Sequence, residues 1–183
     1  MLVITLLFFA LDGFAFIDQI ARSMSDNEII VGLIFFGIIM LGSDILTTPF
    51  SYYKTFIIEE RFGFNKSTPK LFLADKLKGW LMTIIVGGCL LALVIWFYQI
   101  SGSLFWVYAW IVFAVFALVM NMFYAKLIVP LFNKQTPLQE GSLRDKIEQY
   151  AATVGFKLNN IFVIDGSKRS TKANAYFSGL GKN

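Results

Sequence analysis

Residues 79–125 include no Asp, Glu, Lys or Arg, and this uncharged stretch is the strongest constraint in the sequence. A membrane-spanning helix needs about 20 consecutive apolar residues. The stretch therefore has room for two spans joined by a turn, which residues 101–103 (Ser-Gly-Ser) can form. The sequence also places around that turn the amphipathic aromatic residues that prefer a membrane boundary: Trp96, Tyr98, Trp106, Tyr108 and Trp110.

Two earlier segments, residues 1–20 and 29–50, are also apolar and long enough to span a membrane. Hydrophobic residues make up 57% of the 183 residues and charged residues only 15%, which is unlike a water-soluble domain. The first segment lacks the basic start and small-residue cleavage site of a signal peptide, so we expect a retained helix. The sequence predicts about four spans.

Polar residues and a proline interrupt the first two predicted spans. Asp12 and Asp18 are expected near a membrane boundary. An ionised Asp at the centre of a span costs about 2.5–3.5 kcal/mol, so Asp44 should face protein or water. It either lines a polar cavity or lies at a helix end, and the sequence leaves both open. Pro49 is expected to end or kink the second helix.

The basic residues predict the orientation. Four spans leave connections at residues 21–28, 51–78 and 100–103, followed by a polar tail from Lys126. Arg22 lies in the first connection, the third has no basic residue, and every other Lys or Arg lies in the middle connection or the tail. Because Lys and Arg concentrate in cytoplasmic loops, we expect both segments to be cytoplasmic. The net charge of +4 then reflects topology, and no nucleic-acid partner is expected.

The tail has the pattern of a small soluble segment. Residues 142–155 predict an amphipathic helix that begins with a capping pair, Ser142 and Asp145, and stops at a glycine. Residues 160–165 and 172–179 predict two strands separated by a turn. One helix and two strands bury little core, so we expect an incomplete α+β segment.

The sequence contains no histidine and one cysteine, Cys89, within the uncharged stretch. The absence of histidine excludes Ser-His and Cys-His nucleophilic sites and the commonest zinc ligand. A single cysteine forms no internal disulfide, and Cys89 is expected only to pack. Any chemistry that the chain serves needs residues it does not contain, or carboxylates and lysines alone.

The middle connection holds two adjacent carboxylates, Glu59 and Glu60, which on a helix point about 100° apart. They predict a solvated helix end rather than a paired-carboxylate site. The sequence "FGFN" that follows predicts a break between two short helices, with Gly63 giving backbone freedom and Asn65 a turn or cap.

The predicted strand at residues 172–179 offers an edge to which an extended peptide could pair through main-chain hydrogen bonds. The alternative is an internal hairpin that a later strand covers. From the residue pattern alone, the hairpin is the simpler interpretation.

Three stretches resemble the Ste24-type CAAX prenyl proteases, which are integral-membrane zinc metallopeptidases of family M48. They are "EERFGFNKSTPKLFLADKLK" at 59–78, "IVPLFNKQTPLQEGSLRDKI" at 128–147 and "VIDGSKRSTKANAYFSG" at 163–179. The "NAYFSG" stretch is also similar to the bacterial HtpX-type proteases, but the middle motif favours the Ste24 branch. The resemblance implies a bundle of membrane helices around a water-filled chamber, with a zinc-protease domain at its cytoplasmic mouth.

The resemblance also implies roles for particular residues. Asn174 and Ala175, with Tyr176 supporting them, match a strand that pairs with the substrate backbone, which favours the peptide-binding interpretation. Zinc in the family is held by a His-Glu-x-x-His helix and a downstream glutamate, and this segment would follow the matched strand. The present sequence has no such helix, and Lys172 occupies a position where many relatives have histidine. We therefore expect no catalytic or metal-ligating residue in this chain and no zinc bound to it.

The resulting prediction is a mainly α, polytopic membrane protein. Residues 1–133 form the transmembrane region, with a cytoplasmic connection at about 51–78, and residues 134–183 begin a truncated cytoplasmic zinc-peptidase domain. The full-length parent would be a zinc endopeptidase that cleaves prenylated or other membrane-delivered peptides near the C-terminus, in a bacterial inner membrane or the endoplasmic reticulum membrane. Its partners would be a peptide or protein substrate and the lipid bilayer, and this chain alone would be inactive. Two other hypotheses remain: a non-catalytic membrane peptide-binding module, and a small channel or transporter.

Overall fold

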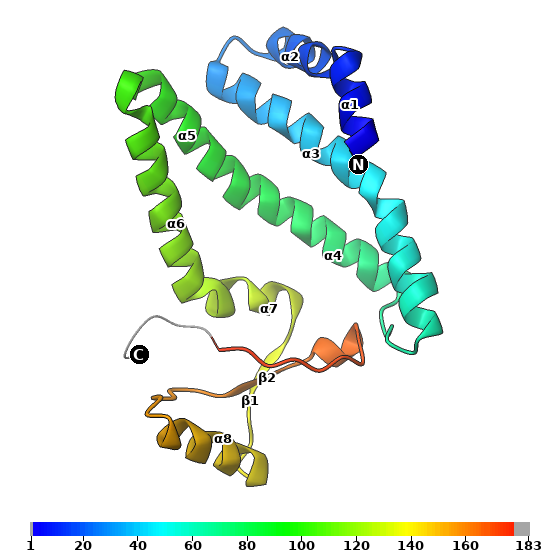
Figure 1. Cartoon of the computed structure of the whole chain (residues 1–183), viewed down its shortest axis with the longest axis vertical. Helices are drawn as coiled ribbons and strands as arrows, with labels where there is room; N and C mark the ends of the chain where they lie inside the picture. Colours follow the sequence, from blue (N-terminus) through cyan, green and yellow to red (C-terminus); the bar gives the residue numbers. More distant parts are fainter. Residues whose placement is uncertain (1, 178–183) are drawn as a thin grey trace. The chain divides into compact units, whose positions relative to one another are not determined.

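The computed structural model describes residues 2–177, which are mainly helical (Figure 1). The helices are α1 (Leu2–Ala10), α2 (Gly13–Met24), α3 (Glu28–Tyr53), α4 (Pro69–Met82), α5 (Gly88–Ser101), α6 (Phe105–Leu127), α7 (Val129–Phe132) and α8 (Ser142–Thr153). Two π-helical segments, Lys54–Glu59 and Thr83–Gly87, continue α3 and join α4 to α5. The strands are β1 (Gln135–Pro137) and β2 (Phe162–Ile164), and 3-10 turns lie at Gly102–Leu104 and Gly166–Lys168.

The chain divides into two compact units. The first comprises Met1–Lys54 and Gly79–Val112, and the second comprises Thr55–Lys78 and Phe113–Asn183. Each unit therefore combines segments that are far apart in the sequence.

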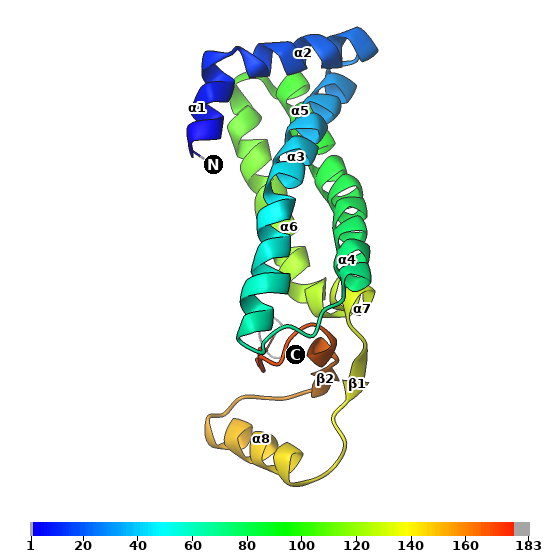
Figure 2. The same cartoon turned by 90° about the vertical axis from the view of Figure 1, so that its right-hand side faces the viewer.

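In the first unit, the first predicted span is not one straight helix. α1 and α2 meet at a bend of 68°, and Asp12 between them has a left-handed backbone with φ of 53° (Figure 2). α2 packs against α3. Asn27 caps the first turn of α3, because the side-chain oxygen of Asn27 accepts hydrogen bonds from the amides of Ile29 and Ile30 at 2.9 and 3.3 Å. The bend places α2 across the start of α3.

The second predicted span is α3, which continues through Pro49. Of the two outcomes expected at Pro49, an end or a kink of the helix, the end is therefore excluded. Just before the proline, the hydroxyls of Thr47 and Thr48 donate to the carbonyl oxygens of Ser43 and Asp44 at 2.9 and 2.6 Å. These bonds lie in the turn before the proline, whose missing amide would have bonded to the carbonyl of Ile45.

Asp44 faces protein, as its membrane position requires. Its Oδ2 accepts a hydrogen bond from Trp80 Nε1 at 3.0 Å and one from Thr48 Oγ1 at 3.4 Å. α3 also lies beside α5 in the same unit (Figure 1). The carboxylate thus joins α3 to the end of α4 through an indole donor.

The turn predicted at residues 101–103 is confirmed. Gly102 has φ of 51°, a conformation that favours glycine. After this turn the chain reverses direction into α6, and aromatic rings meet beside the turn: those of Phe97 and Tyr108 stack at 5.2 Å, and those of Tyr98 and Phe105 meet edge to face at 5.2 Å. The uncharged stretch is therefore a helical hairpin.

By length and composition, Glu28–Glu59 and Pro69–Leu127 qualify as membrane-crossing helical segments, and the bent α1–α2 pair would be a third. Pro69–Leu127 contains the turn at Gly102 and therefore counts as two spans. Together with α3 and the bent α1–α2 pair, the helices agree roughly with the four predicted spans. Among the described residues few apolar side chains are buried: Ile17, Ala21, Val31, Val129 and Ala151. Apolar helices with so little internal core are suited to lipid contact.

In the second unit, β1 and β2 pair antiparallel, with Gln135 opposite Ile164 and Pro137 opposite Phe162. The strand predicted at 160–165 is thus present as β2, but its partner is β1. Residues 172–177 of the other predicted strand form no strand, and residues 178–179 lie outside the described chain.

The predicted helix of the tail is present as α8, whereas its predicted capping pair is not formed. α8 begins at Ser142 after Gly141, without a side-chain cap hydrogen bond. Gly155, with φ of 68°, follows the end of the helix as expected.

The middle connection and the tail belong to the same unit and touch directly, because Asn65 and Ser170 form an isolated antiparallel bridge. Two segments that pair in this way must lie on the same side of a membrane. This agrees with the even number of spans expected between them.

We predict that single cysteines introduced by Lys66→Cys and Lys157→Cys react with a membrane-impermeant maleimide from one side of a sealed vesicle. Ser103→Cys should react only from the other side. The background variant is Cys89→Ser, which leaves the introduced cysteine as the only thiol. Labelling of positions 66 and 157 from opposite sides would contradict the paired arrangement.

Candidate functional site

Asp165 connects the end of β2 to the start of β1. Its carboxylate accepts hydrogen bonds from Lys168 Nζ at 3.0 Å and from the Lys134 amide at 2.7 Å, and its own amide donates to the Lys134 carbonyl at 3.1 Å. The Lys168 hydrogen bond, followed by that of the Lys134 amide, holds the pKa of Asp165 below its ordinary value of 3.8. This carboxylate fixes the 3-10 turn that leads to Arg169.

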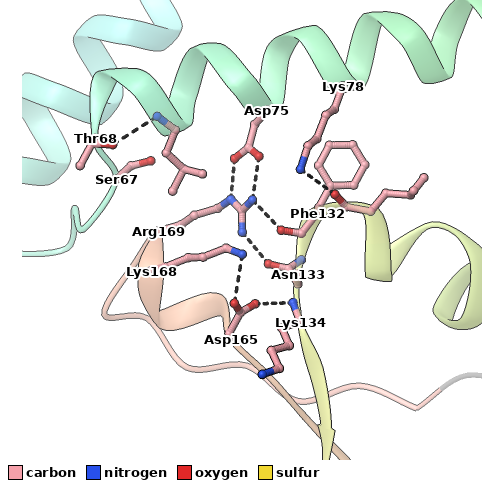
Figure 3. Close-up of polar contacts among 12 residues, drawn as sticks. Ser67, Thr68, Asp75, Lys78, Phe132, Asn133, Lys134, Asp165, Lys168 and Arg169 are labelled. Atoms are coloured by element: carbon pink, nitrogen blue, oxygen red, sulfur yellow. Dashed lines mark hydrogen bonds and ion pairs between the residues drawn. The ribbon is translucent and has the colours of Figure 1, made fainter.

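Arg169 joins three segments of the second unit (Figure 3). Its Nε and Nη2 donate to the two carboxylate oxygens of Asp75 on α4, at 2.6 and 2.7 Å. Nη1 donates to Asn133 Oδ1 at 2.5 Å, and Nη2 also donates to the Phe132 carbonyl at 2.9 Å. The Asp75 hydrogen bond raises the pKa of Arg169 further above its ordinary range, so the guanidinium stays charged.

Residues 169–172 run along the connection between the π-helical segment and α4. The Lys66 amide donates to the Arg169 carbonyl and the Thr171 amide to the Phe64 carbonyl, both at 3.0 Å. Thr171 Oγ1 donates to the carbonyl of Gly63, whose φ of 69° makes the predicted break. Residues 169–172, which precede the candidate residues 174–176, are therefore fixed by hydrogen bonds to residues 63–66.

Asn65 organises this connection and is buried. Its Nδ2 donates to Glu60 Oε2 at 2.8 Å, and its Oδ1 accepts from the Ser67 amide at 2.7 Å. The turn expected at Asn65 is confirmed, and the side chain also engages Glu60.

Lys172 ends the held stretch. Its ammonium donates to Glu59 Oε1 at 3.2 Å and lies 4.6 Å from the centre of the Phe64 ring. Glu59 and Glu60 thus bind different partners, a lysine and an amide, and do not form a carboxylate pair. Glu59 is also only partly solvated, with 23% of its side chain exposed.

Asn174, Ala175 and Tyr176 follow directly and are all exposed. The Ala175 amide donates to the side-chain oxygen of Asn174 at 2.9 Å. The neighbouring Phe177 ring contacts that of Phe156, with centroids 5.7 Å apart. Within residues 2–177, no main-chain hydrogen bond pairs residues 173–177 with a strand. The structure thus presents an accessible backbone immediately after a firmly held one.

Sequence reasoning missed Asp75, Asn133 and Arg169 as a cluster. Each lies in one of the three stretches that resemble the proteases, so the joint occurrence of those stretches was the available signal. Nothing in the spacing of residues 75, 133 and 169 could have paired them.

Zinc, which the family resemblance implies, does not fit the residues described. Across residues 2–177 no group of three or more Cys, Asp or Glu side chains is arranged to hold a metal ion, and the sequence lacks histidine. No chemical step through zinc can be assigned to these side chains.

Comparison with known families identifies the two parts of the chain. The family model described as "CAAX prenyl protease N-terminal, five membrane helices" matches residues 1–134. The chain belongs to the CAAX prenyl protease family. The model of peptidase family M48, a metallopeptidase family, matches residues 137–183. The protein is therefore an integral membrane protein of a zinc-metalloprotease family, as the sequence motifs predicted.

Curated relatives and a solved structure agree. "CAAX prenyl protease 1 homolog" from Arabidopsis thaliana is 44% identical over 158 residues, which are 86% of this chain and 37% of the relative. "CAAX prenyl protease 1" from Saccharomyces cerevisiae is 42% identical over 149 residues, which are 81% of this chain and 33% of the relative. The crystal structure of S. mikatae Ste24p matches with a TM-score of 0.92 at 38% identity, covering 100% of this chain and 44% of that one. The chain thus spans about a third of the length of these curated relatives.

We predict that Arg169→Gln destabilises the second unit by about 2 kcal/mol, because it leaves the partly buried Asp75 carboxylate without its charged donors. Only about a quarter of each side chain is exposed, which limits screening by water. Limited proteolysis should cut residues 170–177 faster in this variant. Asp75→Asn should behave similarly, and the double variant should lose less than the sum of the two.

Arg61→Gln is the matched control, because Arg61 is an exposed arginine of the same unit. It should leave the cleavage rate unchanged. Additive effects of the two cluster variants would show that Arg169 and Asp75 do not act together.

Proposed function

We propose that this chain supplies the N-terminal membrane part of a zinc endopeptidase that cleaves prenylated (CAAX-type) or other membrane-delivered peptides near their C-terminus. Residues 1–133 form its transmembrane region, and residues 134–183 begin its cytoplasmic peptidase domain. The zinc and its ligands belong to a part of the full-length protein that these 183 residues do not include. The proposal rests on membership of the CAAX prenyl protease family across both parts of the chain.

Within this function, Asn174 and Ala175 are the positions that pair with the substrate backbone, and Tyr176 supports them. Their main chain is exposed and, among the described residues, is not paired with another strand. The preceding residues, 169–172, are held by an ion pair and by hydrogen bonds. An accessible backbone beside a rigid support is what the addition of a peptide strand requires.

Substrate pairing would also have to replace one local bond. The Ala175 amide donates to Asn174 Oδ1, and a substrate carbonyl would take that place. The exchange conserves the number of hydrogen bonds, so its main effect is to orient the peptide rather than to add affinity.

We predict that Ala175→Pro in the full-length parent lowers kcat/KM about ten-fold, because proline removes one main-chain donor from the proposed edge. Zinc content should stay near one per protein, measured by atomic emission. Ala175→Gly keeps the donor and should retain most activity. Unchanged turnover in the proline variant would mean that the segment is only structural.

The chain by itself should bind no stoichiometric zinc and cleave no peptide. Zinc measurement and a peptide-cleavage assay on purified protein, with and without a chelator, test this. Tight zinc or chelator-sensitive cleavage would contradict it. Peptide binding without cleavage in the intact parent would favour the non-catalytic binding module instead.

A further inference from the structure

An open depression of about 530 Å³ lies in the second unit, beside the Arg169 cluster. Its lining includes three lysines from different parts of the unit: Lys78 on α4, Lys134 just before β1, and Lys168 in the 3-10 turn. Apolar side chains form other parts of the lining: Pro130, Leu131 and Phe162. The depression therefore combines positive charge with an apolar surface.

The three ammonium groups are engaged to different degrees. Lys78 Nζ donates to the Leu131 carbonyl at 2.9 Å, and Lys168 Nζ pairs with Asp165 at 3.0 Å. Lys134 is exposed, and its side chain extends away from the cluster (Figure 3). Among the described residues nothing binds its ammonium, because the contact with Asp165 uses the Lys134 main-chain amide.

Positive charge is in excess at this place. Asp75 is neutralised by its bidentate bond to Arg169. Among the described residues, Asp165 is then the remaining carboxylate that contacts a lysine of the lining, and it pairs with Lys168 alone, whereas the lining contains three lysines. An anion would be attracted to the side on which Lys134 projects.

The chain places the depression at the end of the membrane spans. Lys78 immediately precedes the uncharged stretch 79–125, and Lys126 in the last turn of α6 immediately follows it. Pro130 and Leu131 come next and are exposed, Leu131 by 45%. Lysines that flank spans in this way lie at the level of the lipid headgroups.

We propose that this depression binds the phosphate of an anionic phospholipid headgroup. Lys134 and Lys168 contact the phosphate, while Leu131 and Phe162 lie against the upper part of the acyl chains. Basic pockets beside membrane helices suit anionic headgroups by charge, and the exposed apolar wall suits a lipid better than a soluble phosphate. The inference does not depend on the proposed peptidase activity.

The test uses the purified 183-residue chain in neutral detergent, titrated with phosphatidylglycerol or phosphatidylcholine and followed by native mass spectrometry. We expect at least a five-fold preference for phosphatidylglycerol. Lys134→Gln should weaken its binding roughly five-fold, since one lysine near an anionic surface contributes on that scale. Lys134→Arg should retain the preference.

Lys146→Gln is the matched control, because it removes the same charge from an exposed position on α8. An equal loss in this control, or no loss in Lys134→Gln, would overturn the site. Lys134 is exposed, so its replacement should not disturb folding, and an unchanged proteolysis pattern checks this. Glycerol 3-phosphate at the same concentration should not displace the lipid; displacement would assign the depression to a soluble phosphate and overturn the lipid proposal.

Discussion

The bidentate ion pair between Arg169 and Asp75 is the contact on which the second unit depends. Its two partners are far apart in the sequence and only partly exposed to water. The planar guanidinium satisfies both carboxylate oxygens and still has donors for Asn133 and the Phe132 carbonyl. A lysine, with one point of charge, could not hold these partners in the same geometry.

The consequence is a fixed starting point for the residues that follow. From Arg169 to Lys172 the chain is held by main-chain bonds to residues 64–66 and by the ion pair with Glu59. Beyond Lys172, exposed residues follow without strand pairing among the described residues. A segment that is rigid at its base and open along its edge is well suited to receive an extended peptide, which is the role proposed for Asn174 and Ala175.

The sequence predicted the features that depend on local pattern. The uncharged stretch and its Ser-Gly-Ser turn predicted the α5–α6 hairpin, and "FGFN" predicted the break at Gly63. It could not predict β1, because "QTP" at 135–137 is short, contains proline and lacks apolar alternation. It also could not predict the partner of Arg169, because polar side chains leave no periodic signal across 94 residues. The final motif formed no strand within residues 172–177, where the amides of Lys172 and Ala175 instead bond to the nearby side chains of Ser170 and Asn174.

The same ion pair links the proposed peptide-binding segment to the segments that flank the uncharged stretch. Asp75 lies on α4, which continues into α5, whereas Phe132 and Asn133 follow α6 and α7. Arg169 therefore bonds to the segment that precedes the uncharged stretch and to the segment that follows it. Any change in the separation of these two segments would strain bonds of 2.5–2.9 Å and act on residues 170–177. The position of the exposed segment is consequently set by these two segments of the second unit as well as by its own residues.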